Sequence, residues 1–128
     1  RFAKWTELCS CLSMLLAILT IFPLRGEESR IIEVLDSLRT AVAPNVECLE
    51  SLITVTPNEG GLLCYTERWR SREALEQHLD SPLYSRVFEA MELSRQLPKL
   101  EFFEVLEVGG LEMVEKVRRS STRARQTE

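Results

Sequence analysis

Residues 65–86 contain five side chains that together could hold a small molecule and move a proton: Tyr65, Trp69, His78, Tyr84 and Arg86. His78 is the only histidine of the chain, and imidazole is the side chain that gains and loses a proton near neutral pH. Aromatic rings can form the walls of a pocket, and an arginine can orient an anionic substrate. We therefore take His78 and Trp69 as candidate catalytic residues, and Tyr65, Tyr84 and Arg86 as candidate substrate-binding residues.

Each of these assignments has a structural alternative. Trp69 ends a strand-like run, and it is either a core residue or one wall of a pocket. His78 either acts as the base or fixes a break in its helix by bonding a backbone carbonyl. Arg86 follows that break, where a charged side chain ordinarily lies on the surface. The sequence alone leaves these alternatives open.

A predicted hairpin positions the first two candidates. Its return strand covers Leu62–Trp69, and side chains alternate along a strand, so Tyr65 and Trp69 are expected on one face. Its first strand covers Cys48–Thr56, which is rich in β-branched residues toward its end. The turn at residues 57–61 contains two glycines, which can adopt positive φ.

A helix over Arg72–Leu79 carries His78 next to the end of that strand. Ser71 stands where a helix is capped by a side-chain oxygen. The triplet from Asp80 to Pro82 interrupts the helix, and it predicts a second start with Ser81 as cap and Pro82 at the first helical position.

Three further elements complete the pattern. Met14–Phe22 reads MLLAILTIF, apolar in both alternating phases, which indicates a central strand covered on both faces. A helix is expected up to Val42, because apolar residues recur there at three- and four-residue steps. Leu100–Val108 is the last predicted strand.

The resulting order, β-α-β-β-α-β, predicts an α+β, ferredoxin-like fold with a four-stranded antiparallel sheet, whose first and third strands are central. Both helices then cover one face of the sheet. Because the first strand is apolar on its other face too, we expect a second copy of the chain to cover it, giving a homodimer.

The core domain is expected over residues 14–108, preceded by an extension at residues 1–13 and followed by a segment at residues 109–128. Leu111, Val114 and Val117 can share one helical face that docks on the partner subunit. Residues 118–128 hold four arginines and no large apolar side chain, so we expect an unpacked, disordered tail.

Composition narrows the class of protein. The net charge of −4 gives no overall attraction to nucleic acid. The apolar run Leu12–Leu24 is too short to span a bilayer, so no membrane is expected. The four cysteines do not have a standard zinc spacing, and Cys9 and Cys11 are too close for a relaxed disulfide. We expect reduced thiols, no bound metal and a cytoplasmic location.

Residues 69–82 spell W-x-S-x-E-x-L-x-x-H-L-x-S-P and follow Tyr65-Thr66-Glu67-Arg68. This stretch resembles the antibiotic biosynthesis monooxygenase family, in particular its quinol-oxidising members, over about residues 14–108. The resemblance implies a dimeric α/β barrel. It also implies a monooxygenase that uses no cofactor and acts on a quinol or polyphenol between sheet and helices. Haem-degrading relatives use a helix histidine where this chain has about Phe88, so haem is not expected.

Such a reaction requires few catalytic groups from the protein. An electron-rich phenolate passes an electron to dioxygen itself, so the protein must only bind, deprotonate and shield its substrate. Two rival functions use the same scaffold: a non-enzymatic ligand-binding or regulatory dimer, and an isomerase. Oxygen uptake separates the first rival from a monooxygenase, and product mass separates the second.

Overall fold

The computed structural model describes residues 13–57 and 61–127. Four strands form one sheet in the order β2-β3-β1-β4, and every neighbouring pair is antiparallel. This is the predicted ferredoxin-like α+β fold, with β1 and β3 in the middle of the sheet. In chain order the elements are β1 (Ser13–Ile21), α2 (Glu28–Val42), β2 (Cys48–Thr56), β3 (Leu62–Trp69), α3 (Arg72–Leu79), the 3-10 helix η2 (Pro82–Tyr84), α4 (Ser85–Met91), β4 (Lys99–Leu106) and α5 (Leu111–Thr127).

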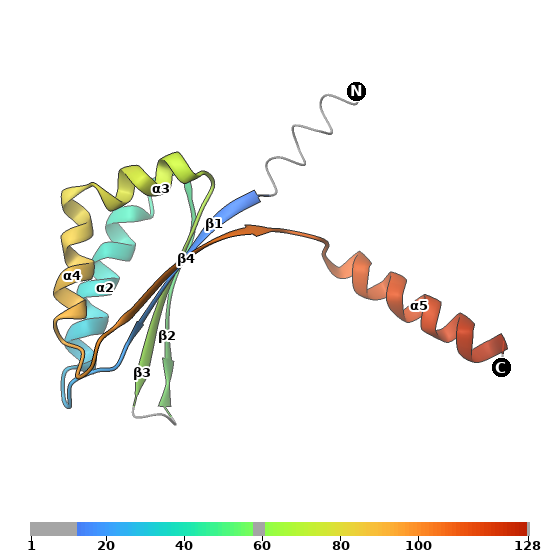
Figure 1. Cartoon of the computed structure of the whole chain (residues 1–128), viewed down its shortest axis with the longest axis horizontal. Helices are drawn as coiled ribbons and strands as arrows, with labels where there is room; N and C mark the ends of the chain where they lie inside the picture. The colour runs from blue at the N-terminus through green and yellow to red at the C-terminus, as the bar shows by residue number, and fades with distance from the viewer. Residues whose placement is uncertain (1–12, 58–60, 128) are drawn as a thin grey trace.

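Helices α2, α3 and α4 lie on one side of the sheet (Figure 1). Apolar residues of α2 recur every three or four positions and are completely enclosed against the sheet: Ile31, Leu35 and Leu38. Opposite them, Leu19 of β1 and Leu63 of β3 are also enclosed. Each such side chain contributes about 1.5–3 kcal/mol on burial. The inner face of the sheet is therefore the core of the domain.

The break between α3 and α4 differs in detail from the prediction. Ser71 caps α3 as expected, since its hydroxyl accepts a hydrogen bond from the Ala74 N–H at 3.1 Å. Ser81 stands at the N-cap position of the next turn as expected, but its hydroxyl makes no capping hydrogen bond and donates to the His78 carbonyl at 2.8 Å instead. Pro82 is the first residue of a single turn of 3-10 helix, as expected, and α4 follows directly after it.

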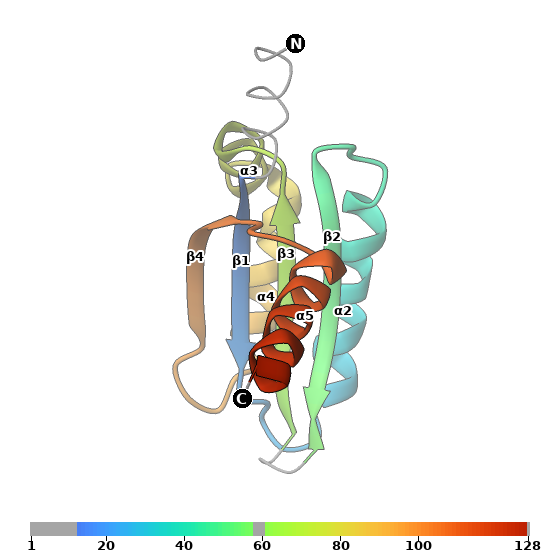
Figure 2. The same ribbon diagram turned by 90° about the vertical axis from the view of Figure 1, so that its right-hand side faces the viewer.

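The other face of the sheet is not covered by any of these helices (Figure 2). Alternation along β1 turns Leu16 and Ile18 to this face, where both are half-buried. Phe103 of β4 pairs with Leu16 and is 42% exposed, and Leu52 of β2 is 45% exposed. The apolar outer face expected from the first strand is present, and we call this set of residues the open sheet face.

Helix α5 runs away from the body of the domain (Figure 1). It includes residues 118–127, for which we expected no regular structure, and the side chains described on it are exposed. The proposed domain limits and the docking of Leu111, Val114 and Val117 stay predictions. None of the helices within residues 13–57 and 61–127 is long and apolar enough to cross a membrane.

Candidate functional site

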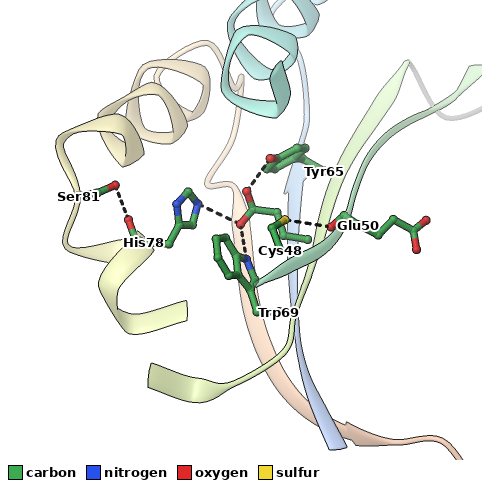
Figure 3. Close-up of polar contacts among 7 residues, drawn as sticks. Cys48, Glu50, Tyr65, Trp69, His78 and Ser81 are labelled. Carbon is green, nitrogen blue, oxygen red and sulfur yellow. Dashed lines mark hydrogen bonds and ion pairs between the residues drawn. The ribbon is translucent and has the colours of Figure 1, made fainter. Parts of the chain in front are cut away.

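A buried carboxylate lies at the centre of the candidate site. Alternation along β3 turns Tyr65, Glu67 and Trp69 toward the helices, and all three are buried. The Tyr65 hydroxyl donates to Oε2 of Glu67 at 2.6 Å, and the Trp69 indole N–H donates to Oε1 at 3.1 Å (Figure 3). Both carboxylate oxygens therefore have a donor from the same strand.

His78 supplies the third partner from α3. Its Nε2 lies 3.2 Å from Oε1 of Glu67, and the two side chains are only 4% and 3% exposed. The contact is close but lacks the angle of a good hydrogen bond, so we treat it as an electrostatic contact. The imidazole also stacks on the Trp69 ring, with centroids 4.7 Å apart and planes 28° apart. Trp69 thus supports both groups of the pair.

The surroundings of Glu67 set its charge. Burial raises the pKa of this carboxyl, but His78 and the donors Tyr65 and Trp69 outweigh burial and lower the pKa below its usual 4.5. Burial and then the charge of Glu67 raise the pKa of the Tyr65 hydroxyl, and the same two causes raise that of Tyr84 to about 12. At neutral pH the site therefore holds a carboxylate and two neutral phenols.

The structure brings four of the five candidates together. Tyr84 of η2 is buried, and its ring meets the His78 ring edge-on with centroids 5.4 Å apart. Arg86 lies elsewhere: its guanidinium donates to the Ser37 carbonyl of α2 at 2.9 Å. Orientation of a substrate by Arg86 has no support in this arrangement.

Two cavities flank this cluster. The inner cavity has a volume of about 10 Å³ and lies between sheet and helices, lined by Tyr65, Glu67, Tyr84 and four apolar residues. A volume of this size holds about one water molecule. The outer cavity has a volume of about 270 Å³, and it lies where the end of α2 meets α3 and η2, with His78 in its lining. Only the outer cavity has room for an aromatic ring.

Trp69 is completely enclosed and lines neither cavity, so packing against His78 accounts for its position. Among the described residues, no three histidine, cysteine or acidic side chains gather as a metal site would require.

Glu67 is the functional candidate that sequence reasoning missed. It lies two residues from both Tyr65 and Trp69, so the alternation that placed those two rings on one face places Glu67 there as well. An ionisable residue at a buried position of a strand is itself the signal, because such a group is retained only when it is paired.

Comparison with known proteins identifies the family. Residues 14–90 match the family profile of antibiotic biosynthesis monooxygenase. No curated protein sequence matches this chain. Solved structures give a consistent result, since many share the fold at low sequence identity.

One of them is an antibiotic biosynthesis monooxygenase with 18% identity and a TM-score of 0.63, covering 73% of this chain and 99% of its own. A protein from Mycobacterium tuberculosis has 24% identity and a TM-score of 0.66, covering 76% of this chain and 99% of its own. A third, from Pseudomonas aeruginosa, has 20% identity and a TM-score of 0.62, covering 77% of this chain and 98% of its own. These likenesses establish the fold, and the profile match covers more than half of the 128 residues. The chain belongs to the antibiotic biosynthesis monooxygenase family.

Proposed function

We propose that the protein is a cofactor-independent monooxygenase that oxidises a quinol or another polyphenol with dioxygen, with His78 as its base. The observation that carries this proposal is the buried contact between His78 Nε2 and Glu67 Oε1 at 3.2 Å. A buried carboxylate is costly to maintain, and paired titratable groups beside a cavity are common at catalytic sites. Family membership supports the reaction class.

The contact with Glu67 determines which nitrogen of His78 can act. A ring nitrogen that faces a carboxylate is favoured in its protonated form, because a lone pair there would repel the carboxylate. In the neutral imidazole the proton is therefore on Nε2, and Nδ1 keeps the lone pair. Nδ1 is the atom that accepts the phenolic proton of the substrate, and Glu67 acts as its positioning residue.

The reaction balances without a bound redox group. A hydroquinone with a free ring position reacts with one dioxygen molecule to give a hydroxyquinone and one water molecule. One oxygen atom forms the new carbon–oxygen bond, and the other leaves in water with two hydrogens of the quinol. Deprotonation by His78 makes the ring a better electron donor to dioxygen, which is the step that the protein accelerates.

Oxygen consumption with a panel of hydroquinones and polyphenols tests this function. We expect uptake above the spontaneous rate, and mass spectrometry after reaction with isotopically labelled dioxygen should find one labelled atom in the product. Label found only in hydrogen peroxide would indicate an oxidase. A product of unchanged mass would indicate an isomerase, and absence of turnover with every compound would exclude the proposal.

A non-enzymatic ligand-binding dimer is the second candidate. The observation in its favour is that every polar group on Glu67 is already engaged and the inner cavity holds only about 10 Å³. In that case the cluster of Tyr65, Glu67, Trp69 and His78 serves stability. Binding of a phenol without oxygen uptake would support this alternative.

We further propose that the protein is a cytoplasmic homodimer formed through the open sheet face. Leu16, Leu52 and Phe103 lie on that face without cover from α2, α3 or α4, and exposed apolar patches of this kind mark interaction sites. A second copy presents the same apolar face, so the contact is self-complementary. Cys48 and Cys64 are free thiols, which supports a reducing compartment.

A further inference from the structure

The His78 imidazole is enclosed on nearly every side. Trp69 stacks on one ring face, the Tyr84 ring meets it edge-on, and Glu67 occupies the approach to Nε2. Neither ring nitrogen has a hydrogen-bond partner among the described residues, and of the two only Nε2 is fully enclosed. Nδ1 therefore keeps access to solvent.

That access leads to the outer cavity. His78 lines the outer cavity and is not among the residues that line the inner one. Only 4% of the His78 side chain is exposed, so only a small part of the imidazole can face the outer cavity. A neutral imidazole nitrogen that has no donor and opens onto a cavity can accept a hydrogen bond from a ligand hydroxyl.

We propose that the outer cavity is a binding site for a neutral phenol, whose hydroxyl donates a hydrogen bond to His78 Nδ1. This binding site would hold the substrate of the proposed monooxygenase, so the expected effect on turnover rests on the proposed function. The binding itself depends on the cavity and the imidazole alone.

The lining of the outer cavity fits this ligand class. Val42, Leu83 and Pro82 provide apolar walls, and no acidic side chain, lysine or arginine takes part in the lining. Without a cation the cavity does not favour a carboxylate or a phosphate. Its volume of about 270 Å³ is sufficient for an aromatic ring.

The remaining polar groups of the lining restrict how the ligand is oriented. The side-chain oxygen of Asn45 accepts from the Glu47 N–H at 3.0 Å, and the Ser81 hydroxyl donates to the His78 carbonyl at 2.8 Å. Both groups therefore already make a hydrogen bond within the protein, whereas Nδ1 makes none with the described residues. The phenol hydroxyl is expected to point at His78, with the ring edge toward solvent.

Phenol and toluene are the matched probes, because they share a ring and differ in the hydroxyl. We expect phenol to shift the backbone amide resonances of Asn45, Gln77 and Ser81, and toluene to bind about tenfold or more weakly. Equal affinity for both, or phenol shifts confined to other residues, would overturn the proposal.

Three variants locate the site. Ala41→Phe places a ring in the outer cavity from an exposed position on α2. Ala43→Phe is its control, two residues further on at an exposed position outside the lining. Ala17→Val fills the inner cavity. Melting temperatures verify that each variant folds.

We expect Ala41→Phe to weaken phenol binding about tenfold or more, and turnover of the quinol with it, while Ala43→Phe and Ala17→Val leave phenol binding unchanged. Loss of binding in Ala17→Val with Ala41→Phe unaffected would overturn this inference and leave the proposed function intact. Loss of phenol binding in Ala41→Phe, in a protein that never consumes oxygen, would support the site and exclude the monooxygenase activity.

Discussion

His78 Nε2 lies 3.2 Å from Oε1 of Glu67, and neither side chain is more than 4% exposed. The pair joins β3 to α3, the next element along the chain, across the two-residue connection at residues 70 and 71. Because the carboxylate is also bonded by Tyr65 and Trp69, it is fixed in place and can orient the imidazole. An oriented imidazole is useful to catalysis and to stability alike, and the variants below separate the two.

His78→Gln should abolish proton transfer while keeping the contact with Glu67, because the glutamine amide donates a hydrogen bond but accepts no proton near neutral pH. We expect turnover to fall about 10²–10⁴-fold with little change in melting temperature. His78→Ala should lose the same activity and also about 1–3 kcal/mol of unfolding free energy, since Glu67 loses a partner. Glu73→Gln, at an exposed position of the same helix, is the control. Full oxygen uptake in His78→Gln would leave His78 with a structural role only.

Glu67→Gln should be destabilising in spite of its similar shape. Tyr65, Trp69 and His78 all present donors to this position, and an amide nitrogen would face at least one of them. We expect a loss of about 1–3 kcal/mol in urea unfolding, as for other buried polar groups left without a matching partner. Glu76→Gln, an exposed carboxyl on α3, should change the unfolding free energy by less than about 0.5 kcal/mol. A neutral effect of Glu67→Gln would mean that the carboxylate charge is not needed.

Acid should destabilise the protein through Glu67, and Tyr65 should control how much. The folded-state pKa of Glu67 is lowered, so its contribution to stability is complete above the unfolded value of 4.5 and is lost as the pH falls through the folded value. Tyr65→Phe removes one donor, which moves the folded pKa back toward 4.5 and reduces the acid-dependent part of the unfolding free energy. Tyr84→Phe is the control, because no hydrogen bond joins Tyr84 to Glu67 within the described residues. Urea unfolding from pH about 7 to about 3 measures the difference. Equal slopes for wild type and Tyr65→Phe would contradict the expected role of that hydroxyl.

Most of the fold follows from local patterns in the sequence. The bounds of β2, β3 and α3 agree with those expected from alternation, helical spacing and the Ser71 cap. The two-sided apolar run gives β1 its central place. At Ser81 the local pattern gave the N-cap position correctly, but the hydroxyl bonds back to the preceding turn at His78 and makes no capping hydrogen bond.

The site was predictable only in part. Alternation placed Tyr65 and Trp69 together, and the position of His78 beside the strand end follows from the short connection through residues 70 and 71. The role of Glu67 could not be inferred with the same ease, since an isolated glutamate ordinarily lies on the surface. Its burial depends on a donor from another element, and such a pairing is a property of tertiary packing. Arg86 is the opposite case: its charge made it a candidate for binding an anion, but its guanidinium donates to the Ser37 carbonyl of α2 instead.

Dimerisation through the open sheet face can be tested with one substitution. Phe103 pairs with Leu16 across the β1–β4 ladder and is 42% exposed in the isolated chain. If a second copy covers this face, Phe103→Asp buries an unpaired carboxylate at the interface, and that cost outweighs the apolar contact it replaces. Wild type should sediment near twice 14.7 kDa at micromolar concentration, and Phe103→Asp near 14.7 kDa.

Leu97→Asp provides the matched control for this experiment. Leu97 is 89% exposed and lies outside the sheet, between α4 and β4, so the same chemical change there should leave the mass at the dimer value. Because Phe103 points away from the core, the Phe103→Asp monomer should keep its far-ultraviolet circular dichroism spectrum. A wild-type monomer, or a Phe103→Asp protein that stays dimeric, would mean that the open sheet face is covered in another way or is free in solution.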